Sequence, residues 1–534
     1  MPDTPDAPDA LNQPLPPRAR DLWAEDPVLR HYAAVFGADA GALAAYGRAL
    51  GSEEMVGAGR AANRHPPELL SFDRGGRRLD QVRFHPGYHT HLRHGLAAGY
   101  AALPWEGGTG GHVTHAAMVY LQSRTEPGTA CPMTMTYAAI PALSGPLADR
   151  WRPLLMSRVY DPGFAPPDRK TGATMGMAMT ERQGGTDVRA NTTRAEADGK
   201  GYRLTGHKWF CSAPMSDGFL TLAQAKRGLT CFVVPRWCPD GAQNPIRLMR
   251  LKDKLGNRAN ASAEIEYHRA WAERLGEEGE GIRRIIRMVH HTRLDTALAP
   301  AGLMRAALAE AHWWCAGRRV FRRRLIDQPL MRVVLADLAL DWEAATALGL
   351  RVAAAFDAPE QAPFARVAVA LAKFLNNKLC PGLVCEAMEC LGGMGYTDDT
   401  PMPMLYREAP LNSIWEGSGN VICLDIIRTL ARDAGAAGML GAELEAARGA
   451  DRRFDKALKA WRARWRGVPE EADARRFAEE TAVLLAASVL LRHGPPAVSD
   501  GYVATRLSER RCRVAGAVAG LDTGAVIRRI AAAG

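Results

Sequence analysis

The sequence changes character twice along its 534 residues. Residues 18–175 and 281–434 are rich in Ala, Leu and Arg at helix-compatible spacing, whereas residues 176–280 contain short alternating β-branched stretches separated by Asp-Gly turns. Alternation with period two favours strands, and a 3.6-residue period favours helices. The sequence therefore predicts an α+β protein in which an antiparallel β-domain stands between helical domains.

At this length we expect several domains rather than one core. The predicted domains are a helical domain at 1–175 whose first 17 residues are disordered, a β-domain at 176–280, a helical bundle at 281–434, and a basic helical domain at 435–534.

Composition excludes several classes of protein. Hydrophobic residues make up 47% and charged residues 24%, as in soluble globular proteins, and no apolar run reaches the length of a membrane span. The acidic, proline-rich N-terminus lacks the apolar core of a secretory signal. The ten cysteines include no C-x-x-C pair, and no H-E-x-x-H is present, so we expect no metal site. Scattered thiols favour a cytoplasmic location.

The net charge of +10 indicates an anionic partner, such as a CoA phosphate or a nucleic acid. Excess Arg also arises from GC-rich coding sequences, so charge alone leaves this interpretation open.

Glu416 is the most informative single residue. It follows the apolar pair Ile414-Trp415 and precedes Gly417-Ser418-Gly419. Desolvation by these apolar neighbours would raise its pKa toward neutrality and suit it to act as a general base. The glycines permit close approach to a ligand, and the apolar run at 421–424 resumes a helix whose N-terminal amides would hold a polar group. Considered alone, such a Glu is more often a solvated turn residue.

Two segments of the β-region suit a planar heteroaromatic ligand. Residues 177–187 contain Thr180 and Thr186 as hydroxyl donors, with Gly184 and Gly185 between them, and residues 206–212 contain the aromatic and small residues Phe210, Cys211 and Ser212. The alternatives are a plain hairpin turn and an aromatic core strand. No complete G-x-G-x-x-G follows a strand, so a Rossmann dinucleotide site is not supported.

These segments resemble motifs of the acyl-CoA dehydrogenase family. Residues 180–187 are similar to the family's T-E-x-x-x-G-S-D, residues 206–212 to G-x-K-x-[WY]-I-[ST], and Leu391–Tyr396 to L-G-G-x-G-Y. Arg318 to Gln328 resembles R-x-x-F-G-x-P-L-x-x-x-Q, except that Arg322 replaces the glycine, and Glu389 stands where the family usually has Gln. The Arg407-Glu408 pair followed by Trp415-Glu416-Gly417-Ser418 resembles the C-terminal signature.

The resemblance implies a helical N-terminal domain, a middle β-domain, a four-helix-bundle domain and FAD as cofactor. It implies that Glu416 removes the α-proton of an acyl-CoA thioester while FAD accepts the β-hydride. The cofactor contacts that it implies are Met177, Met179, Thr180, Gly184, Gly185, Thr186, Phe210, Cys211, Ser212, Arg318, Phe321, Gln328, Gly392, Gly393, Ile414, Trp415, Gly417, Ser418, Gly419, Asn420 and Leu424.

Within the family the chain is most similar to the AidB-like alkylation-response branch. The supporting segments are Asn12-Gln13-Pro14, Asn63 with Pro66–Leu70, Arg83–Pro86, Lys252–Arg258 and Asn412–Asn420. This branch implies a homotetramer built as a dimer of dimers, weak dehydrogenase activity, duplex DNA binding by the C-terminal domain, and an electron acceptor that the sequence does not identify. The alternatives are a protein that protects DNA with a vestigial redox site and an ordinary short- or branched-chain acyl-CoA dehydrogenase.

The C-terminal segment points to DNA independently of the resemblance. Phe454, Leu458, Trp461 and Trp465 form one apolar stripe at helical spacing, and basic residues occupy the rest of the circumference. A second basic cluster is formed by Arg506, Arg510, Arg511 and Arg513. Such faces bind phosphate backbones, although many are only solvated helix surfaces. The predicted DNA contacts are Arg428, Arg452, Lys456, Lys459, Arg462, Arg466, Arg510 and Arg511.

Overall fold

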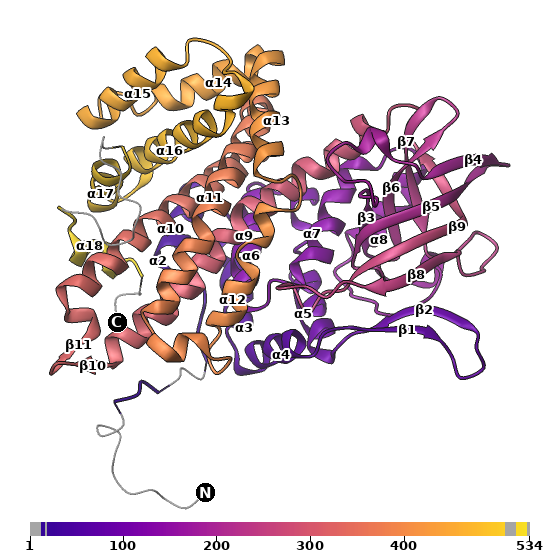
Figure 1. Cartoon of the computed structure of the whole chain (residues 1–534), viewed down its shortest axis with the longest axis horizontal. Helices are drawn as coiled ribbons and strands as arrows, with labels where there is room; N and C mark the ends of the chain where they lie inside the picture. Colours follow the sequence, from indigo (N-terminus) through magenta and orange to yellow (C-terminus); the bar gives the residue numbers. More distant parts are fainter. Residues whose placement is uncertain (1–11, 16–18, 508–519, 531–534) are drawn as a thin grey trace, which may run out of the picture. The chain divides into compact units, whose positions relative to one another are not determined.

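The computed structural model describes residues 12–15, 19–507 and 520–530, so most of the expected disordered tail, and Arg510, Arg511 and Arg513, lie outside the described residues. The chain forms two compact units, each assembled from separate stretches (Figure 1). Unit 1 comprises Met1–Glu53, His112–Arg124 and Thr296–Gly534, and unit 2 comprises Glu54–Gly111 and Thr125–Asp295.

The helices of unit 1 are α2 (Pro27–Val35), α3 (Ala40–Leu50), α6 (Gly111–Thr125), α10 (Pro329–Phe356), α11 (Ala362–Glu389), α12 (Met402–Glu408), α13 (Gly419–Arg432), α14 (Ala434–Glu445), α15 (Arg452–Arg464), α16 (Ala474–His493), α17 (Pro496–Arg506) and α18 (Thr523–Arg528). The helix α9 (Gly281–Gly317) begins in unit 2 and ends in unit 1, which also holds the short hairpin β10 (Arg319–Val320) and β11 (Arg323–Arg324).

Helix α11 forms the centre of unit 1, where it contacts α10, α13, α14 and α16 (Figure 1). The stretch Pro359–Glu389 is long and apolar enough to span a membrane, but 78% of its most apolar window is buried inside the protein. A helix that is hydrophobic on most of its faces is expected at the core of a large helical unit. The apolar composition of α11 is therefore explained by burial among other helices.

Asparagines on α11 compensate for a proline in α9. Pro300 lacks the amide that would bond the carbonyl of Thr296 one turn earlier. Asn377 donates its side-chain Nδ2 to that carbonyl oxygen over 2.8 Å, and Asn376 donates to the next carbonyl, that of Ala297, over 2.9 Å. Both asparagines are buried, so these bonds fix the position of α11 against α9.

Ion pairs join the C-terminal helices to the bundle. Glu443 of α14 accepts two hydrogen bonds of 2.8 Å from Arg351 of α10 and also bonds Arg492 of α16. Arg506 of α17 bonds Asp337 and Asp341 of α10 over 2.6 Å and 2.8 Å. These charges are largely buried, so removing one partner would leave the other uncompensated.

Unit 2 is built around a seven-stranded sheet. Its strands are β3 (Met175–Ala178), β4 (Arg194–Asp198), β5 (Gly201–Ser212), β6 (Gly218–Ala225), β7 (Gly228–Pro235), β8 (Ile246–Leu251) and β9 (Ser262–Leu275). β7 pairs with both β6 and β9, and the pairings β6–β4, β4–β5 and β5–β9 complete a closed ring. Most pairs are antiparallel as predicted, but β3 and β4 pair with β6 in parallel.

The helices of unit 2 are α4 (Glu53–Arg64), α5 (Pro86–Ala97), α7 (Ala130–Ala139) and α8 (Pro146–Leu155). A hairpin of β1 (Glu68–Phe72) and β2 (Arg78–Arg83), which the prediction of mostly helices did not anticipate, lies beside β8. Its turn is stabilised by Asp73, which accepts hydrogen bonds from the amides of Gly75 and Arg77, and by Gly76 at φ +77°.

The ion pairs of Glu443 with Arg351 and Arg492 yield a prediction for stability. We expect Glu443→Gln to lower the unfolding free energy by about 2 kcal/mol at neutral pH, because the arginines lose their buried counter-charge. Burial alone would raise the pKa of Glu443, but Arg351 and Arg492 hold that pKa below its usual value. The stabilisation is therefore present above the unfolded pKa of about 4.3 and is lost as pH falls through the folded pKa.

Denaturant unfolding at several pH values measures this difference between Glu443→Gln and wild type. Asp500→Asn serves as the control, because its ion pair with Arg453 is exposed and should contribute less than about 1 kcal/mol. Equal losses in the two variants, or a difference that grows on acidification, would contradict the assignment.

Candidate functional site

The loop after β3 in unit 2 adopts a tight turn that requires its glycines. Glu181 and Gly184 exchange backbone hydrogen bonds of 3.0 Å and 3.2 Å, and Gly184 has φ +141°. A Cβ atom on Gly185 would lie 2.4 Å from the Thr180 hydroxyl. The turn therefore brings backbone against the hydroxyl that was predicted to contact the cofactor.

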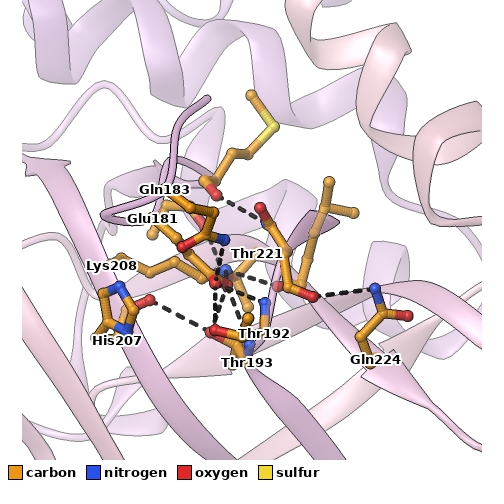
Figure 2. Close-up of polar contacts among 12 residues, drawn as sticks. Glu181, Gln183, Thr192, Thr193, His207, Lys208, Thr221 and Gln224 are labelled. Carbon is orange, nitrogen blue, oxygen red and sulfur yellow. Dashed lines mark hydrogen bonds and ion pairs between the residues drawn. The ribbon is translucent and has the colours of Figure 1, made fainter. Parts of the chain in front are cut away.

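A buried ion pair fixes this loop to the sheet (Figure 2). Lys208 of β5 donates to Glu181 Oε1 over 2.8 Å and to the carbonyl of Leu222 over 2.7 Å. Glu181 also accepts hydrogen bonds from the amides and hydroxyls of Thr192 and Thr193 and from the Gln183 amide. Burial would raise a carboxyl pKa, but Lys208 and these donors hold the pKa of Glu181 well below its usual range.

The two segments predicted to flank the cofactor are neighbours. The Trp209 amide donates to the Thr180 carbonyl over 2.8 Å, so the start of the loop lies beside β5. Cys211 is buried, whereas Phe210 is 51% exposed, and Lys252 lies 3.6 Å and 4.7 Å from the ring centres of Trp209 and Phe210. Phe210 is thus an accessible aromatic surface and not a core residue.

A pocket of about 600 Å³ opens elsewhere in unit 2. Its lining combines the cations Arg189 and Arg283 with Glu280 and the apolar side chains of Leu229, Ile282 and Ile286. Arg189 is exposed, and Gln224 donates to its carbonyl over 3.0 Å. This volume lies in the usual range of ligand sites, and the mixed lining suits a ligand with both phosphate and apolar parts.

In unit 1, Glu416 has a strained backbone. Its φ is +57°, a left-handed conformation that is uncommon for residues other than glycine, and Gly417 follows at φ +100°. Glu416 is half-buried. Its neighbour Ile414 is 65% exposed within the chain, so the predicted desolvation by Ile414 is not provided by the fold itself. Strain of this kind persists only where the surroundings enforce it, and it occurs preferentially at functional sites.

A buried lysine enforces the conformation of this loop. Lys373 of α11 is 2% exposed and donates to the carbonyls of Asn412 and Gly417, both over 2.9 Å. The Asn412 side chain in turn accepts a 2.7 Å bond from the indole of Trp415. Both sides of Glu416 are therefore tied to the core. Helix α13 begins at Gly419, which confirms the predicted helix after the glycines.

Two further predicted cofactor segments, residues 318–328 and the turn Gly392–Tyr396, are partly exposed in unit 1. Arg318 donates to the Asn12 carbonyl over 2.8 Å, and Gln328 donates to the carbonyl of Val320 over 3.0 Å. Phe321 is 90% exposed at φ +49°. Gly392 and Gly393 begin an exposed 3₁₀ turn that ends at Tyr396. Phe321 is therefore accessible to a ligand, whereas Arg318 and Gln328 are hydrogen-bonded within the chain.

The structure divides the predicted DNA contacts into two groups. Arg452, Lys459, Arg466 and Arg428 are exposed and form no ion pair within the described part of the chain, and Lys456 is also exposed. Arg462 instead pairs with Glu445, and Arg506 of the second basic cluster is buried against Asp337 and Asp341. The apolar stripe packs on α16: Phe454 and Leu458 are buried, and Trp465 lies 5.5 Å from Phe477.

Sequence reasoning did not assign roles to Glu181, Lys208, Lys373, Lys378 and Arg475. Lys373 carries a local signal, because a Lys flanked by apolar residues on a buried stretch of helix must satisfy its charge internally. Arg475 carries none, because its contacts are defined only by the packing of distant helices.

Comparisons with known proteins identify the family. Residues 12–162 match the adaptive response protein AidB N-terminal domain, residues 176–270 the acyl-CoA dehydrogenase middle domain, and residues 279–431 the acyl-CoA dehydrogenase C-terminal domain. AidB of Escherichia coli strain K12 is 44% identical over 94% of both chains. The chain belongs to the AidB-like acyl-CoA dehydrogenases.

Solved structures agree with this family. The apo form of Bd2924 has a TM-score of 0.82 at 28% identity, with 90% of this chain and 99% of that chain covered. Caenorhabditis elegans ACDH-11, solved in complex with C11-CoA, has a TM-score of 0.81 at 26% identity over 97% of this chain and 92% of that chain. The predicted fold class is confirmed, and the chain is an FAD-dependent oxidoreductase.

The residues present fit FAD. The Thr180 and Ser212 hydroxyls and the exposed Phe210 ring suit a flavin, and Gly184, where an added Cβ would meet open space, leaves the backbone open to close approach. Among the described residues no cluster of metal-ligating side chains is present. The individual cofactor contacts stay predictions.

The Gly185 contact gives a test of the loop. We expect Gly185→Ala to weaken FAD binding by about tenfold or more, because the new methyl displaces Thr180, and tenfold corresponds to only about 1.4 kcal/mol. Flavin fluorescence during dilution of the purified protein measures the affinity. Gly57→Ala is the matched control, since a Cβ there meets open space. Wild-type affinity in Gly185→Ala would show that the loop does not position the cofactor.

Proposed function

We propose that this protein oxidises an acyl-CoA-like thioester, with Glu416 as the base that removes the α-proton. The observation that carries the proposal is the strained, enforced conformation of Glu416 in a loop of the family's C-terminal signature. Bound FAD supplies the acceptor for the β-hydride. Loss of the α-proton and the β-hydride converts the Cα–Cβ single bond into a double bond, and Glu416 retains the proton.

The pocket of unit 2 supports a CoA-type substrate. Arg189 and Arg283 supply positive charge for phosphates, and Ile282, Ile286 and Leu229 supply apolar surface for the less polar part of the carrier. ACDH-11, a solved structure of similar fold, was crystallised with C11-CoA, which favours the same class of ligand here.

A single substitution tests the base. We expect Glu416→Gln to retain FAD absorbance but to lose at least about a hundredfold in the rate of bleaching by acyl-CoA without oxygen, because amides do not accept the proton. Glu360→Gln is the control, since Glu360 is exposed and lies outside the loop and the predicted cofactor motifs. Bleaching of Glu416→Gln at the wild-type rate would remove Glu416 from the mechanism.

We also propose that the C-terminal helices bind duplex DNA without strong sequence preference, as part of a response to DNA alkylation. The specific observation is that Arg452, Lys459 and Arg466 are exposed and have no acidic partner among the residues that the structure describes, whereas neighbouring arginines are neutralised. Such charges release counterions from a phosphate backbone. The match of residues 12–162 to an adaptive response protein supports the biological context.

Removing these three charges tests the DNA proposal. We expect the combined Arg452→Ala, Lys459→Ala and Arg466→Ala variant to bind duplex DNA more weakly and to reduce the slope of log affinity against log salt by about 2 to 3. The control replaces Arg453, Arg462 and Arg464, which are already ion-paired. Absence of wild-type binding at low salt, or equal effects in both variants, would refute it.

The assembly and location are further parts of the proposal. Phe321, Leu330 and Tyr396 in unit 1 are between 83% and 90% exposed, and large apolar side chains left this open favour contact with further copies of the chain in a tetramer. The described cysteines are all free thiols and most are buried, which favours a reducing cytoplasm.

A further inference from the structure

Two cations meet at the start of helix α13. A Cβ atom on Gly419 would lie 3.0 Å from Cε and 3.2 Å from Nζ of Lys378, and 3.3 Å from a guanidinium nitrogen of Arg475. Lys378 comes from α11 and Arg475 from α16, which contacts α13 (Figure 1). Both cationic groups therefore lie directly over the first residue of the helix.

The surroundings hold these cations without neutralising them. Arg475 donates to the side-chain oxygen of Asn420 over 2.8 Å and lies 5.5 Å from the ring centre of Phe374. Lys378 donates to the Ser413 hydroxyl over 2.8 Å. Within the described part of the chain neither cation has a carboxylate partner, whereas most arginines of the same C-terminal helices do.

This arrangement is electrostatically unfavourable by itself. A helix N-terminus carries a partial positive charge, and cations near it are destabilising. The Ser418 side chain does not cap α13, so the first amides of the helix add to the positive potential. Burial and the Arg475 charge lower the pKa of Lys378, which reflects this crowding. A bound anion would relieve the repulsion and would accept hydrogen bonds from both side chains.

We propose that Lys378 and Arg475 bind the phosphates of FAD, so that the C-terminal extension contributes a residue to cofactor binding. The two cations can approach the start of α13 this closely because Gly419 lacks a side chain, and Gly419 lies three residues after Glu416 in the loop of the family signature. Residues 432–534, including α16, lie outside all three matched family domains. Arg475 is thus a cofactor-binding residue contributed by a segment that those domains do not contain.

Release of FAD from the full-length holoprotein tests this assignment. Flavin fluorescence after serial dilution gives the dissociation constant at about 0.1 M and about 0.5 M salt. We expect Arg475→Ala to raise the dissociation constant about tenfold at the lower salt. The ratio of the variant's constant to that of wild type should fall at the higher salt, because the interaction is electrostatic. Lys378→Met should act in the same direction, and Arg475→Lys should restore part of the affinity.

The neighbouring Arg476 provides the matched control, because it is exposed, lies on the same helix and pairs with Glu480. Arg476→Ala should keep wild-type retention of FAD, and circular dichroism should show unchanged helix content in all variants. Wild-type FAD affinity in folded Arg475→Ala, equal losses in Arg475→Ala and Arg476→Ala, or a loss that salt does not affect would overturn the proposal.

Duplex DNA is the competing source of phosphate, so its binding is measured on the same proteins. Weakened DNA binding with unchanged FAD retention in Arg475→Ala would assign the two cations to DNA and overturn the proposal. The inference rests on FAD as the cofactor and not on Glu416 as the base. If Glu416→Gln still allowed bleaching, the role of Glu416 would be refuted but the binding of FAD phosphates by Lys378 and Arg475 would not. A wild-type protein that never retains FAD would refute both proposals.

Discussion

The conformation of the Glu416 loop in unit 1 depends on the hydrogen bonds that the buried ammonium group of Lys373 donates. A charge buried in a helical core is tolerated only if its hydrogen bonds are satisfied, and here the carbonyls of Asn412 and Gly417 satisfy them. These two carbonyls bracket Glu416, so the same bonds fix the loop and support a left-handed conformation that costs on the order of 1 to 3 kcal/mol. The start of α13, and with it the Lys378 and Arg475 cradle, follows because the helix begins immediately after this loop.

In unit 2 a loop is likewise held by a buried charge, but here the loop supplies the acidic partner and not the carbonyl acceptors. There the loop contributes the carboxylate of Glu181, and strand β5 contributes the lysine, Lys208. Glu181 also collects donors from Thr192 and Thr193, so a single buried carboxylate fixes the loop, the strand and the segment that leads into β4 in one register. Breaking such a pair exposes an uncompensated charge to the core, which makes alternative positions of the loop costly. In both units, glycine-containing loops that would otherwise be mobile are held by buried charge rather than by apolar packing.

Local sequence was sufficient for the features that depend on local chemistry. The glycines at 184 and 185, the helix after Gly419 and the apolar stripe of α15 were all predictable, because turn geometry and helical periodicity are properties of neighbouring residues. The β1–β2 hairpin was missed because its strands are short and β2 is mostly polar. Contacts between Arg475 and Asn420, 55 residues apart, and between Arg506 and Asp337, 169 residues apart, have no local pattern at all. Whether an arginine is available to a ligand was therefore undecidable from composition.

The pairing of arginines with distant acids changes how the net charge of +10 is understood. The basic C-terminal sequence does not translate into a uniformly basic surface, because Glu443, Glu445, Glu480, Asp337 and Asp341 neutralise much of it. Among the described residues, the charge that remains includes two groups with different geometry: the exposed residues Arg452, Lys459 and Arg466, and the cations above Gly419. Exposed charges spread along α15 and the segment after it suit an extended polyanion, whereas two cations converging on a helix N-terminus suit a compact phosphate group. Helix α16 packs against α15 and also carries Arg475. A phosphate bound to Arg475 would therefore also stabilise the helix against which α15 and its exposed cations pack.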